Sequence, residues 1–499
     1  MILEARLEKA ILRECDKWIQ KYHEYHNHLH REWLRNSERL KVAPPKNVKI
    51  PEYWTDDKKH NPFYVKKNVV AIARSIVKKI NSNTYEPMDP YIKRVPKASG
   101  GDRLVTVYQI PDTAVSALFY SDLISKNRHR FSSFSYAYRN DRNVHFAIQD
   151  LSVELSKNSR SFIAEFDFSD FFGSIDHEYL FGQLHQDGFL VSDLEERVIR
   201  AFLKKRGKGI PQGTSLSLFL ANLVCWRLDK TLERNGLIFA RYADDTVVFS
   251  QSYESICRAY NAVDEFSRAT RVPVNLRKSD GINLLSLPGA KNEISSKENF
   301  DFLGYSVGIN KISAKEATVK RIKKQISYLL FRNLIQPLTY YPNNIGIMPA
   351  NNRDKSLLIA MSQIRRYLYG GLLHRQIWSY VNKKSASIHF KGVLSFYPLI
   401  NDSQQLSELD GWLVSTIFKS INKRRKLLIQ LGFVIQAAGF PFNVPQEKLA
   451  EAFKNTRIKK RRLLELPSFT LFYKAMERGI LELGLEKVMH AESSKYQYA

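Results

Sequence analysis

The sequence predicts an α+β protein in which strands in the middle of the chain are flanked by helical N-terminal and C-terminal extensions. Two short runs, residues 162–168 and 240–249, are rich in β-branched and aromatic residues, a composition typical of strands. Between them, residues 216–228 form an apolar stretch of helical length that follows a Pro- and Gly-containing break. Residues 1–90 and those from 311 onward read as helical.

Asp244 and Asp245 lie at the midpoint of the second run, residues 240–249, which reads as a β-hairpin. Successive side chains on a strand face opposite ways, so only a turn between two strands can bring both aspartates near one site. Two like charges that close repel strongly unless a cation lies between them. Oxygen ligands of this kind select Mg²⁺ or Mn²⁺. A solvated Asp-Asp turn is the alternative when the pair is considered alone.

A second strand with a carboxylate lies upstream. Residues 162–176 read as a strand that runs into a turn, with Asp167 at the C-terminal end of the strand. Between the two carboxylate strands, Pro and Gly break the chain at residues 209–215, and Gln212 presents an amide at that break. Together the three segments resemble motifs A, B and C of the reverse transcriptase family, in the family's order.

Two later segments extend the resemblance. Residues 275–279 resemble motif D, and the next segment resembles motif E, the primer grip, with Phe302, Leu303, Gly304 and Tyr305. Five motifs in the family's order and at sensible spacing make the resemblance specific. It implies a right-hand polymerase fold of fingers, palm and thumb, and an RNA-directed DNA polymerase activity.

The resemblance also implies the chemistry of the site. Phosphoryl transfer uses two metal ions about 3.5–4 Å apart, one at the attacking 3′-hydroxyl and one at the leaving pyrophosphate. Asp167 and Asp244 would bind both ions and Asp245 would complete the set, so Mg²⁺ or Mn²⁺ is the expected cofactor. Lys278 would offer a proton to the pyrophosphate, although Arg277 adjoins it and either residue also fits a solvated basic position.

The expected deoxynucleotide site combines palm and fingers. Phe172 lies five residues after Asp167, where the family places a ring that collides with a 2′-hydroxyl; the alternative is a core ring. Lys97 and Arg103 flank a Gly-Gly turn as point charge and fork for a triphosphate, although basic hairpin residues are more often simply solvated. The implied nucleotide-binding set is Lys97, Arg103, Arg139, Asp170, Phe171, Phe172 and Gln212.

Composition points to a polyanionic partner. The 77 Lys and Arg residues against 50 Asp and Glu give a formal net charge of +27. Such a surplus favours nucleic acid, with salt-dependent affinity, and an anionic membrane surface is the other partner of that charge. No apolar run approaches the ~20 residues that span a bilayer, so no membrane association is expected. Three scattered cysteines predict neither disulfides nor a zinc site, and the cytoplasm is the expected location.

The resemblance divides the chain into an N-terminal helical extension (1–90), fingers and palm (91–310), a thumb (311–390) and a basic helical RNA-binding region with a tail (391–499). Basic residues interleaved with aromatic ones suit structured RNA and single strands, although charge runs are usually solvated faces. The candidate RNA-binding residues are Arg424, Arg425, Lys459, Lys460, Arg461 and Arg462.

Among reverse transcriptases, the layout resembles the bacterial defence-associated enzymes, once filed as unknown groups. No acidic cluster after the palm suits an RNase H site, and residues 304–310 lack the Val-Thr-Gly signature of retron enzymes. The resemblance implies a companion noncoding RNA as template and scaffold, dNTPs as substrates, a cDNA product and a role in antiphage immunity. The ninth type of that class, which makes deoxyadenylate polymer and assembles as an oligomer, is the specific candidate, so a homo-oligomer is among the expected assemblies.

Three alternatives stay open at this point. One is a retron-like enzyme, one is an enzyme derived from a group II intron, and one is a maturase-like RNA-binding protein with a vestigial site. The complete set of three acidic residues disfavours the last, because a site freed from chemistry need not keep them. Some members of the class prime synthesis from their own side chains, and the polar C-terminal segment carries two tyrosines, Tyr496 and Tyr498, as candidate primers.

Overall fold

The computed structural model describes residues 2–96, 102–277, 279, 281–292, 294–342, 354–458 and 460–494. The described chain divides into two compact units. The first contains the residues up to 27 and residues 48–298, and the second contains residues 28–47 and those from 299 onward. The long N-terminal helix α1 (Ile2–Ser37) contributes to both units.

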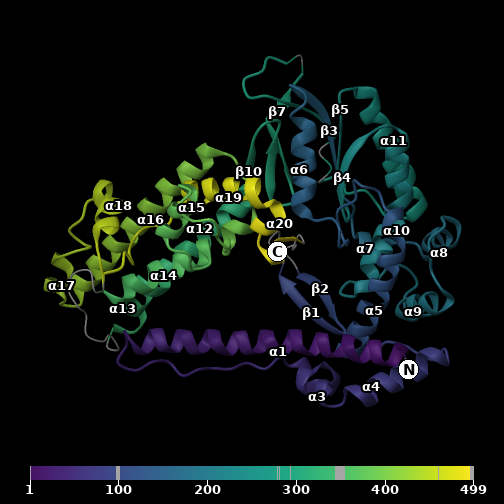
Figure 1. Ribbon diagram of the computed structural model, residues 1–499, viewed down its shortest axis with the longest axis horizontal. Helices are drawn as coiled ribbons and strands as arrows, with labels where there is room; N and C mark the ends of the chain where they lie inside the picture. Colours follow the sequence, from purple (N-terminus) through teal and green to yellow (C-terminus); the bar gives the residue numbers. More distant parts are fainter. Residues whose placement is uncertain are drawn as a thin grey trace. The chain divides into compact units, whose positions relative to one another are not determined.

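The first unit is built on a five-stranded sheet with the order β4-β5-β3-β6-β7 (Figure 1). All neighbours are antiparallel except β6 and β7. The helices α6 and α10 pack against β4, and α11 packs against β3 and β5. The bounds are β3 Arg160–Phe166, β4 Ile238–Tyr242, β5 Asp245–Ser250, β6 Ile282–Ser286, β7 Ser296–Lys297, α6 Val144–Leu155, α10 Ser215–Arg234 and α11 Tyr253–Thr270.

The strands form where the sequence alternates or runs apolar, and their residues are largely buried. Val247, Val248 and Phe249 of β5 are all buried, as expected for a strand near the middle of a covered sheet. The apolar helix α10 has the buried stripe of a core helix, and Thr214 caps its N-terminus by accepting a hydrogen bond from the Ser217 amide. The sheet and α10 together carry the segments that resemble motifs A, B and C.

A hairpin and several helices complete the first unit. The hairpin pairs β1 (Tyr91–Pro96) with β2 (Asp102–Val107), as the sequence predicts. Leu7, Ile11 and Cys15 of α1 are buried in the same core as the helices that follow. The other helices of the first unit are α2 Tyr53–Asp56, η1 Lys58–His60, α3 Pro62–Lys67, α4 Val69–Asn81, α5 Ile110–Asn127, η2 Arg128–Arg130, α7 Phe171–Ser174, α8 His177–Gln186 and α9 Asp193–Leu203.

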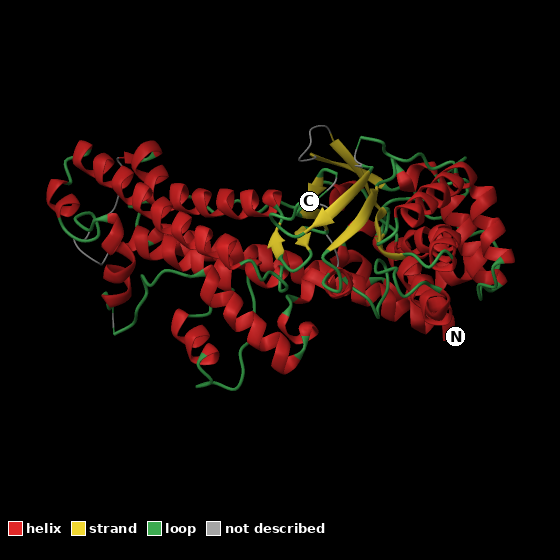
Figure 2. Cartoon of the chain, turned by 90° about the horizontal axis from the view of Figure 1, so that it is seen from above, coloured by secondary structure: helices red, strands yellow, loops and turns green. Residues whose placement is uncertain are grey.

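The second unit begins with a small antiparallel sheet of order β10-β9-β8 and is otherwise helical (Figure 2). The long helix α16 forms its centre, with a buried stripe that includes Leu409, Leu413 and Ile417. The elements are β8 Asn299–Phe302, β9 Tyr305–Gly308, β10 Ile312–Ala314, α12 Glu316–Leu330, the π-helix η3 Phe331–Ile335, α13 Gln336–Tyr340, α14 Lys355–Tyr369, α15 His374–Val381, η6 Val393–Phe396, α16 Ser403–Gln430, α17 Val434–Ala438, α18 Gln446–Asn455, α19 Phe469–Leu483, α20 Leu485–Val488 and η7 Ala491–Ser494.

The α+β class and the helical extensions agree with the prediction from sequence. The unit boundary falls before β8, whereas the sequence places fingers and palm as far as residue 310. The small sheet joins the second unit because α16 and its cap complete the edge of β10. Ile312 donates its amide hydrogen to Asn401 Oδ1 at 2.7 Å, and Ala314 donates to Gln405 Oε1 at 2.8 Å. Across the described ranges, every helix is too short or too polar to cross a bilayer.

Candidate active site

The three predicted acidic residues meet at one end of the five-stranded sheet. Asp167 follows β3 directly, and the last residue of β3, Phe166, pairs with Thr246 of β5. Tyr242 pairs with Asp245, so Ala243 and Asp244 form the two-residue turn of the β4–β5 hairpin. The register therefore brings the backbone of Asp167 beside the Asp244–Asp245 turn. The structure confirms the predicted hairpin at this position.

The turn contains a residue in a disfavoured conformation. Ala243 has φ +60°, in the left-handed region that costs a non-glycine residue about 1–2 kcal/mol. Such conformations persist where the surroundings hold them, and they cluster at functional sites. The hairpin thus presents Asp244 from a turn that needs external support.

Asn275, a residue of the motif D segment for which the sequence alone predicts no role, holds the Asp167 carboxylate. Its side-chain amide donates to Asp167 Oδ2 at 2.7 Å, and its backbone amide donates to the Asp167 carbonyl at 2.8 Å. Ser279 Oγ accepts a hydrogen bond from the Asp167 amide at 3.3 Å. The motif D segment therefore fixes the end of β3. Lys278, the predicted proton donor, lies outside the described residues.

The motif A and motif B segments are joined through their backbones. Gly209 donates to the carbonyl of Ile175, and Ile210 donates to that of Phe172, both at 2.7 Å. A Cβ on Gly209 would lie 2.6 Å from the Gly173 carbonyl oxygen, so only glycine permits this approach. Gln212 is exposed at the start of the motif B segment.

Phe172 is half-buried beside an aromatic neighbour from the fingers loop. The ring of Tyr138 meets that of Phe172 edge to face, with centroids 6.5 Å apart. Tyr138 has φ +59°, and its carbonyl accepts a hydrogen bond from Tyr120 Oη at 2.8 Å. Burial, together with the charge of Asp244, raises the pKa of Tyr138 well above its usual range. Tyr138 thus borders both the predicted gate and the acidic turn. The sequence points only to the neighbouring Arg139 and predicts no role for Tyr138.

Two residues of the predicted nucleotide set have other roles in this structure. The ring of Phe171 is buried in the core at 2% exposure, against Phe168. The guanidinium of Arg139 is 6% exposed and pairs bidentately with Asp141, at 2.7 and 3.0 Å. It also donates to the carbonyl of Ser132 at 2.6 Å. Both predictions are corrected: Phe171 packs the core, and Arg139 closes its own loop.

Three further residues of the predicted nucleotide-binding set are Asp170, Arg103 and Lys97. Asp170 has φ +46° at the N-terminus of α7, and its carboxylate lies so close to Gly173 that a Cβ there would clash. Arg103 lies in β2 with its backbone paired to Val95. Lys97 lies outside the described residues.

The four primer-grip residues form a tight hairpin between β8 and β9. Leu303 and Gly304 both have positive φ, +49° and +87°, and join the pair Phe302 and Tyr305. Two consecutive positive φ values are those of a type I′ turn. All four residues are buried, and the Tyr305 ring packs edge to face on Tyr397. The primer grip therefore owes its shape to the core of the second unit.

The prediction that Arg424 binds RNA is wrong. Arg424 is 1% exposed and pairs with Asp354 at 2.9 Å, and it donates to the carbonyl of Leu334 in the π-helix at 2.7 Å. It stabilises the helices of the second unit and faces no solvent. Arg425, Lys460, Arg461 and Arg462 are exposed. Lys459, Tyr496 and Tyr498 lie outside the described residues.

The end of the five-stranded sheet offers oxygen donors for a metal ion. Within the described ranges, no three His, Cys, Asp or Glu side chains converge as a closed metal site. The backbones of Asp167, Asp244 and Asp245 nevertheless share one end of the sheet, and like charges that come together there would repel one another without a cation. Their donor atoms are carboxylate oxygens, the type that hard divalent cations take. The residues therefore fit Mg²⁺ or Mn²⁺ by chemistry and by backbone placement.

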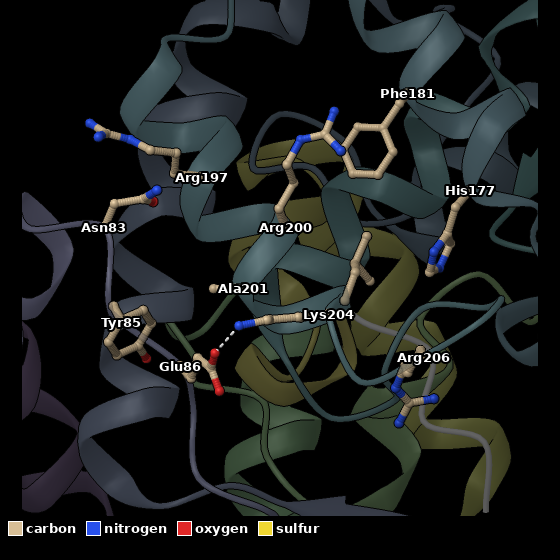
Figure 3. Close-up of a pocket in the computed structure, with 11 residues that line it drawn as sticks. Asn83, Tyr85, Glu86, His177, Phe181, Arg197, Arg200, Ala201, Lys204 and Arg206 are labelled. Carbon is tan, nitrogen blue, oxygen red and sulfur yellow. Dashed lines mark hydrogen bonds and ion pairs between the residues drawn. The ribbon is translucent and has the colours of Figure 1, made fainter.

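The first unit also contains a basic pocket of about 460 Å³. It is lined by α8, α9 and the chain after α4, and Arg200 lies over the ring of Phe181 at 3.8 Å (Figure 3). Lys204 is paired with Glu86. Arg197 and Arg206 also line the pocket, and neither forms an ion pair within the part of the chain that the structure describes. The pocket therefore offers cationic groups together with an aromatic ring.

Comparisons with known proteins agree with the motif order. Residues 95–307 match the family described as reverse transcriptase (RNA-dependent DNA polymerase). The retron Ec86 reverse transcriptase of Escherichia coli is 25% identical over 248 residues, covering 48% of this chain and 69% of that protein. The protein YkfC of Escherichia coli K12 is 24% identical over 170 residues, which is 31% of this chain and 44% of that protein.

Among solved structures, two fungal telomerases in complex with a fragment of telomeric RNA show a distant likeness. The one from Candida albicans is 12% identical, with a TM-score of 0.35 over 79% of this chain and 69% of that chain. The one from Candida tropicalis is 13% identical, with a TM-score of 0.36 over 79% and 68%.

The family match covers every element of the five-stranded sheet, and the retron enzyme is a bacterial relative with the same activity in its name. Asp167 and the Asp244–Asp245 turn, which the motif resemblance singles out, lie at one end of that sheet. Residues 95–307 of this chain therefore match the reverse transcriptase (RNA-dependent DNA polymerase) family, and a bacterial reverse transcriptase is among the relatives.

Proposed function

We propose that this protein copies an RNA template into DNA at the end of the five-stranded sheet, with dNTPs as substrates and Mg²⁺ or Mn²⁺ held by Asp167, Asp244 and Asp245. The observation that supports the proposal is the strand register, in which the backbones of Asp167 and of the Asp244–Asp245 turn lie at the same end of the sheet. When bound, the ions would lower the pKa of the attacking hydroxyl and neutralise the phosphates. Asn275 orients Asp167, and Gln212 would position the incoming nucleotide.

The test is primer extension on an RNA template with Asp244→Asn. The substitution removes a charged ligand at nearly constant volume, so DNA synthesis should fall by at least a thousandfold while thermal unfolding stays unchanged. Asp193→Asn, on the exposed first turn of α9, is the matched control and should retain full activity. Synthesis by Asp244→Asn within tenfold of the wild type would exclude the metal assignment.

A structured noncoding RNA is the proposed template and scaffold. The net charge of +27, the basic pocket beside α9 and the exposed residues Arg425, Lys460 and Arg461 support it. Phosphate contacts supply most of the affinity of such surfaces. Sequencing the nucleic acid that co-purifies with the protein tests this directly. A random pool of cellular RNA in place of one enriched species would favour a maturase-like or non-specific binder.

The proposed defence role rests on the resemblance to defence-associated bacterial enzymes. The same resemblance supports four further proposals, which are a cytoplasmic location, a homo-oligomer, homopolymer synthesis and priming from Tyr496 or Tyr498. A phenol ionises far more readily than a sugar hydroxyl, so a metal-bound tyrosine can replace the 3′-hydroxyl. Protease and nuclease digestion of the product should leave a nucleotide on the C-terminal peptide. Full-length product free of peptide from the double Tyr→Phe variant would rule out this priming.

Loss of phage protection in the Asp244→Asn strain tests the defence role.

A further inference from the structure

Arg241 is a fully buried cation that contacts the Ala243–Asp244 turn. It lies in β4, two residues before Ala243, and none of its side chain is exposed. A buried charge is costly unless it is paired and hydrogen-bonded. Its partner Asp229, on α10, is equally buried, and the two are joined by two bonds of 2.6 Å. Burial disfavours the charged guanidinium, but Asp229 outweighs burial and the pKa of Arg241 is raised.

The remaining arms of the guanidinium reach the catalytic motifs. Nη1 donates to the Ala243 carbonyl at 3.0 Å, and this is the residue held at φ +60° in the turn. Nη1 also lies 3.3 Å from Asn222 Oδ1, on the motif B helix α10. Nη2 donates to Ser135 Oγ at 2.7 Å. One side chain thus connects the turn of motif C, the helix of motif B and the fingers loop.

The backbone around Arg241 repeats these connections. Arg241 donates its amide hydrogen to the Phe134 carbonyl, and Tyr136 donates to the Arg241 carbonyl, both at 2.9 Å. Asn222 donates its side-chain amide to the Ala137 carbonyl at 2.8 Å. Ser135 therefore forms an isolated parallel bridge with Arg241 of β4, and the same loop carries Tyr138, whose ring contacts Phe172. Arg241 is therefore a buried residue that supports both the Ala243–Asp244 turn and the Ser135–Tyr138 loop.

We propose that Arg241 is a positioning residue that holds the Ala243–Asp244 turn and the Ser135–Tyr138 loop in register, so that the metal-binding carboxylate and the sugar gate face one site. A buried ion pair contributes little net stability, and hydrophobic replacements are often neutral or stabilising. Its value lies in the fork geometry of the guanidinium, which a lysine cannot reproduce. The inference rests on the proposed metal site at Asp167, Asp244 and Asp245.

The first test compares two lysine substitutions of buried arginines. Arg241→Lys keeps the charge beside Asp229 but loses the fork. Arg424→Lys is the matched control, because Arg424 is likewise buried, paired with an aspartate and bonded to a backbone carbonyl, and it belongs to the second unit. Mn²⁺ binding is measured by electron paramagnetic resonance, and amide hydrogen exchange is followed in the peptide that spans residues 242–246.

Arg241→Lys should weaken Mn²⁺ binding about tenfold or more, since residues that orient metal ligands typically contribute 10–100-fold. It should also speed exchange in the turn peptide, whereas Arg424→Lys should do neither. Wild-type Mn²⁺ affinity in a folded Arg241→Lys protein would overturn the proposal. Equal weakening in both lysine variants would also overturn it, by showing a general loss of stability.

A second variant covers the case in which Arg241→Lys fails to fold. The pair Arg241→Met and Asp229→Leu removes both buried charges at similar volume, and it should fold with equal or higher thermal stability. Mn²⁺ binding should nevertheless weaken, so that stability and metal affinity move in opposite directions. Unchanged Mn²⁺ affinity in this folded double variant would end the proposal. Absence of Mn²⁺ binding in the wild type would instead contradict the proposed function.

Discussion

Asp167 has one carboxylate oxygen engaged by the Asn275 amide, at 2.7 Å. The amide donates to the charged oxygen and fixes the orientation of the carboxylate, as groups behind metal ligands do. Asn275→Ala should therefore raise the Mg²⁺ concentration for half-maximal synthesis roughly tenfold, within the range of 10–100-fold such partners contribute. Asn275→Asp should be worse because it adds a like charge beside Asp167.

The measurement is single-nucleotide incorporation across a Mg²⁺ titration. Asn292→Ala is the control, because Asn292 bonds Ser286 and Ser296 in the same unit with side-chain distances of 2.9 and 2.8 Å, away from the carboxylates. Identical Mg²⁺ curves for Asn275→Ala and Asn292→Ala would show that Asn275 has only a structural role.

We expect sugar selection to depend on two rings, Phe172 and Tyr138, whose centroids are 6.5 Å apart. Phe172→Ala removes the bulk that excludes a 2′-hydroxyl and should lower the preference for dNTP over rNTP by two orders of magnitude or more. Tyr138→Ala should relax it less, because it removes only the ring that supports the gate. The ratio of kcat/KM for dATP and ATP measures both, with the core variant Phe171→Leu as control. Unchanged discrimination between dATP and ATP in Phe172→Ala would show that Phe172 is a core residue and does not exclude the 2′-hydroxyl.

Charge runs show why single residues escape prediction. The run Lys423-Arg424-Arg425-Lys426 reads as a uniformly basic face, but successive residues on a helix point about 100° apart, so one of them turns inward. Which one turns inward depends on Asp354, seventy residues upstream, and on a backbone carbonyl in a π-helix. Neither partner is visible in the local pattern. Arg139 escaped prediction for a similar reason, because its partners include backbone carbonyls.

Elements with strong local signals were predictable. The β3 strand and the β4–β5 hairpin follow from short β-branched runs and from the turn that the Asp-Asp pair requires, and the resemblance to motifs A and C implies only that their carboxylates share one site. The predicted boundary at residue 310 leaves β8 and β9 with the palm and β10 with the thumb, whereas all three strands lie in the second unit, where the β10 amides donate to the side chains of Asn401 and Gln405. Long-range bonds of that kind leave no periodic trace in sequence.

The junction of β10 with α16 is also expected to depend on pH. Asp402 caps α16 through the Gln405 amide, accepts a hydrogen bond from Ser313 Oγ at 2.7 Å and lies 3.1 Å from the Lys311 ammonium. Burial alone would raise the pKa of Asp402, but these partners lower it below the usual 3.8. A lowered native pKa contributes stability above 3.8, and that contribution is lost as the pH falls through the native value.

Asp402→Asn should therefore lower the free energy of unfolding by about 1 kcal/mol at neutral pH. The difference between wild type and variant should shrink as the pH is lowered below 3.8. Urea unfolding at a series of pH values measures it. A difference that is constant over the whole series would show that the charge of Asp402 makes no contribution.

At the scale of the whole molecule, the surplus of 27 positive charges is larger than any one site uses, so position has to be separated from total charge. Three double variants to glutamine remove the same charge from different places. Arg197 with Arg206 lies in the basic pocket, Lys460 with Arg461 lies in the C-terminal cluster, and Arg258 with Arg268 lies on α11, where both arginines pair with acidic residues of the same helix.

Removing one cation that binds a phosphate should flatten the dependence of log affinity on log salt by roughly 0.7–0.9. The pocket pair and the C-terminal pair should each lower RNA affinity and reduce this slope by the equivalent of one or two phosphates. The α11 pair should lower affinity only slightly through the general field and leave the slope unchanged, because its charges are already neutralised within the helix. Affinity measured by fluorescence anisotropy at several salt concentrations separates these outcomes. The same slope for all three variants would mean that RNA is held by diffuse charge, and that neither the pocket nor the C-terminal cluster binds phosphate at a defined position.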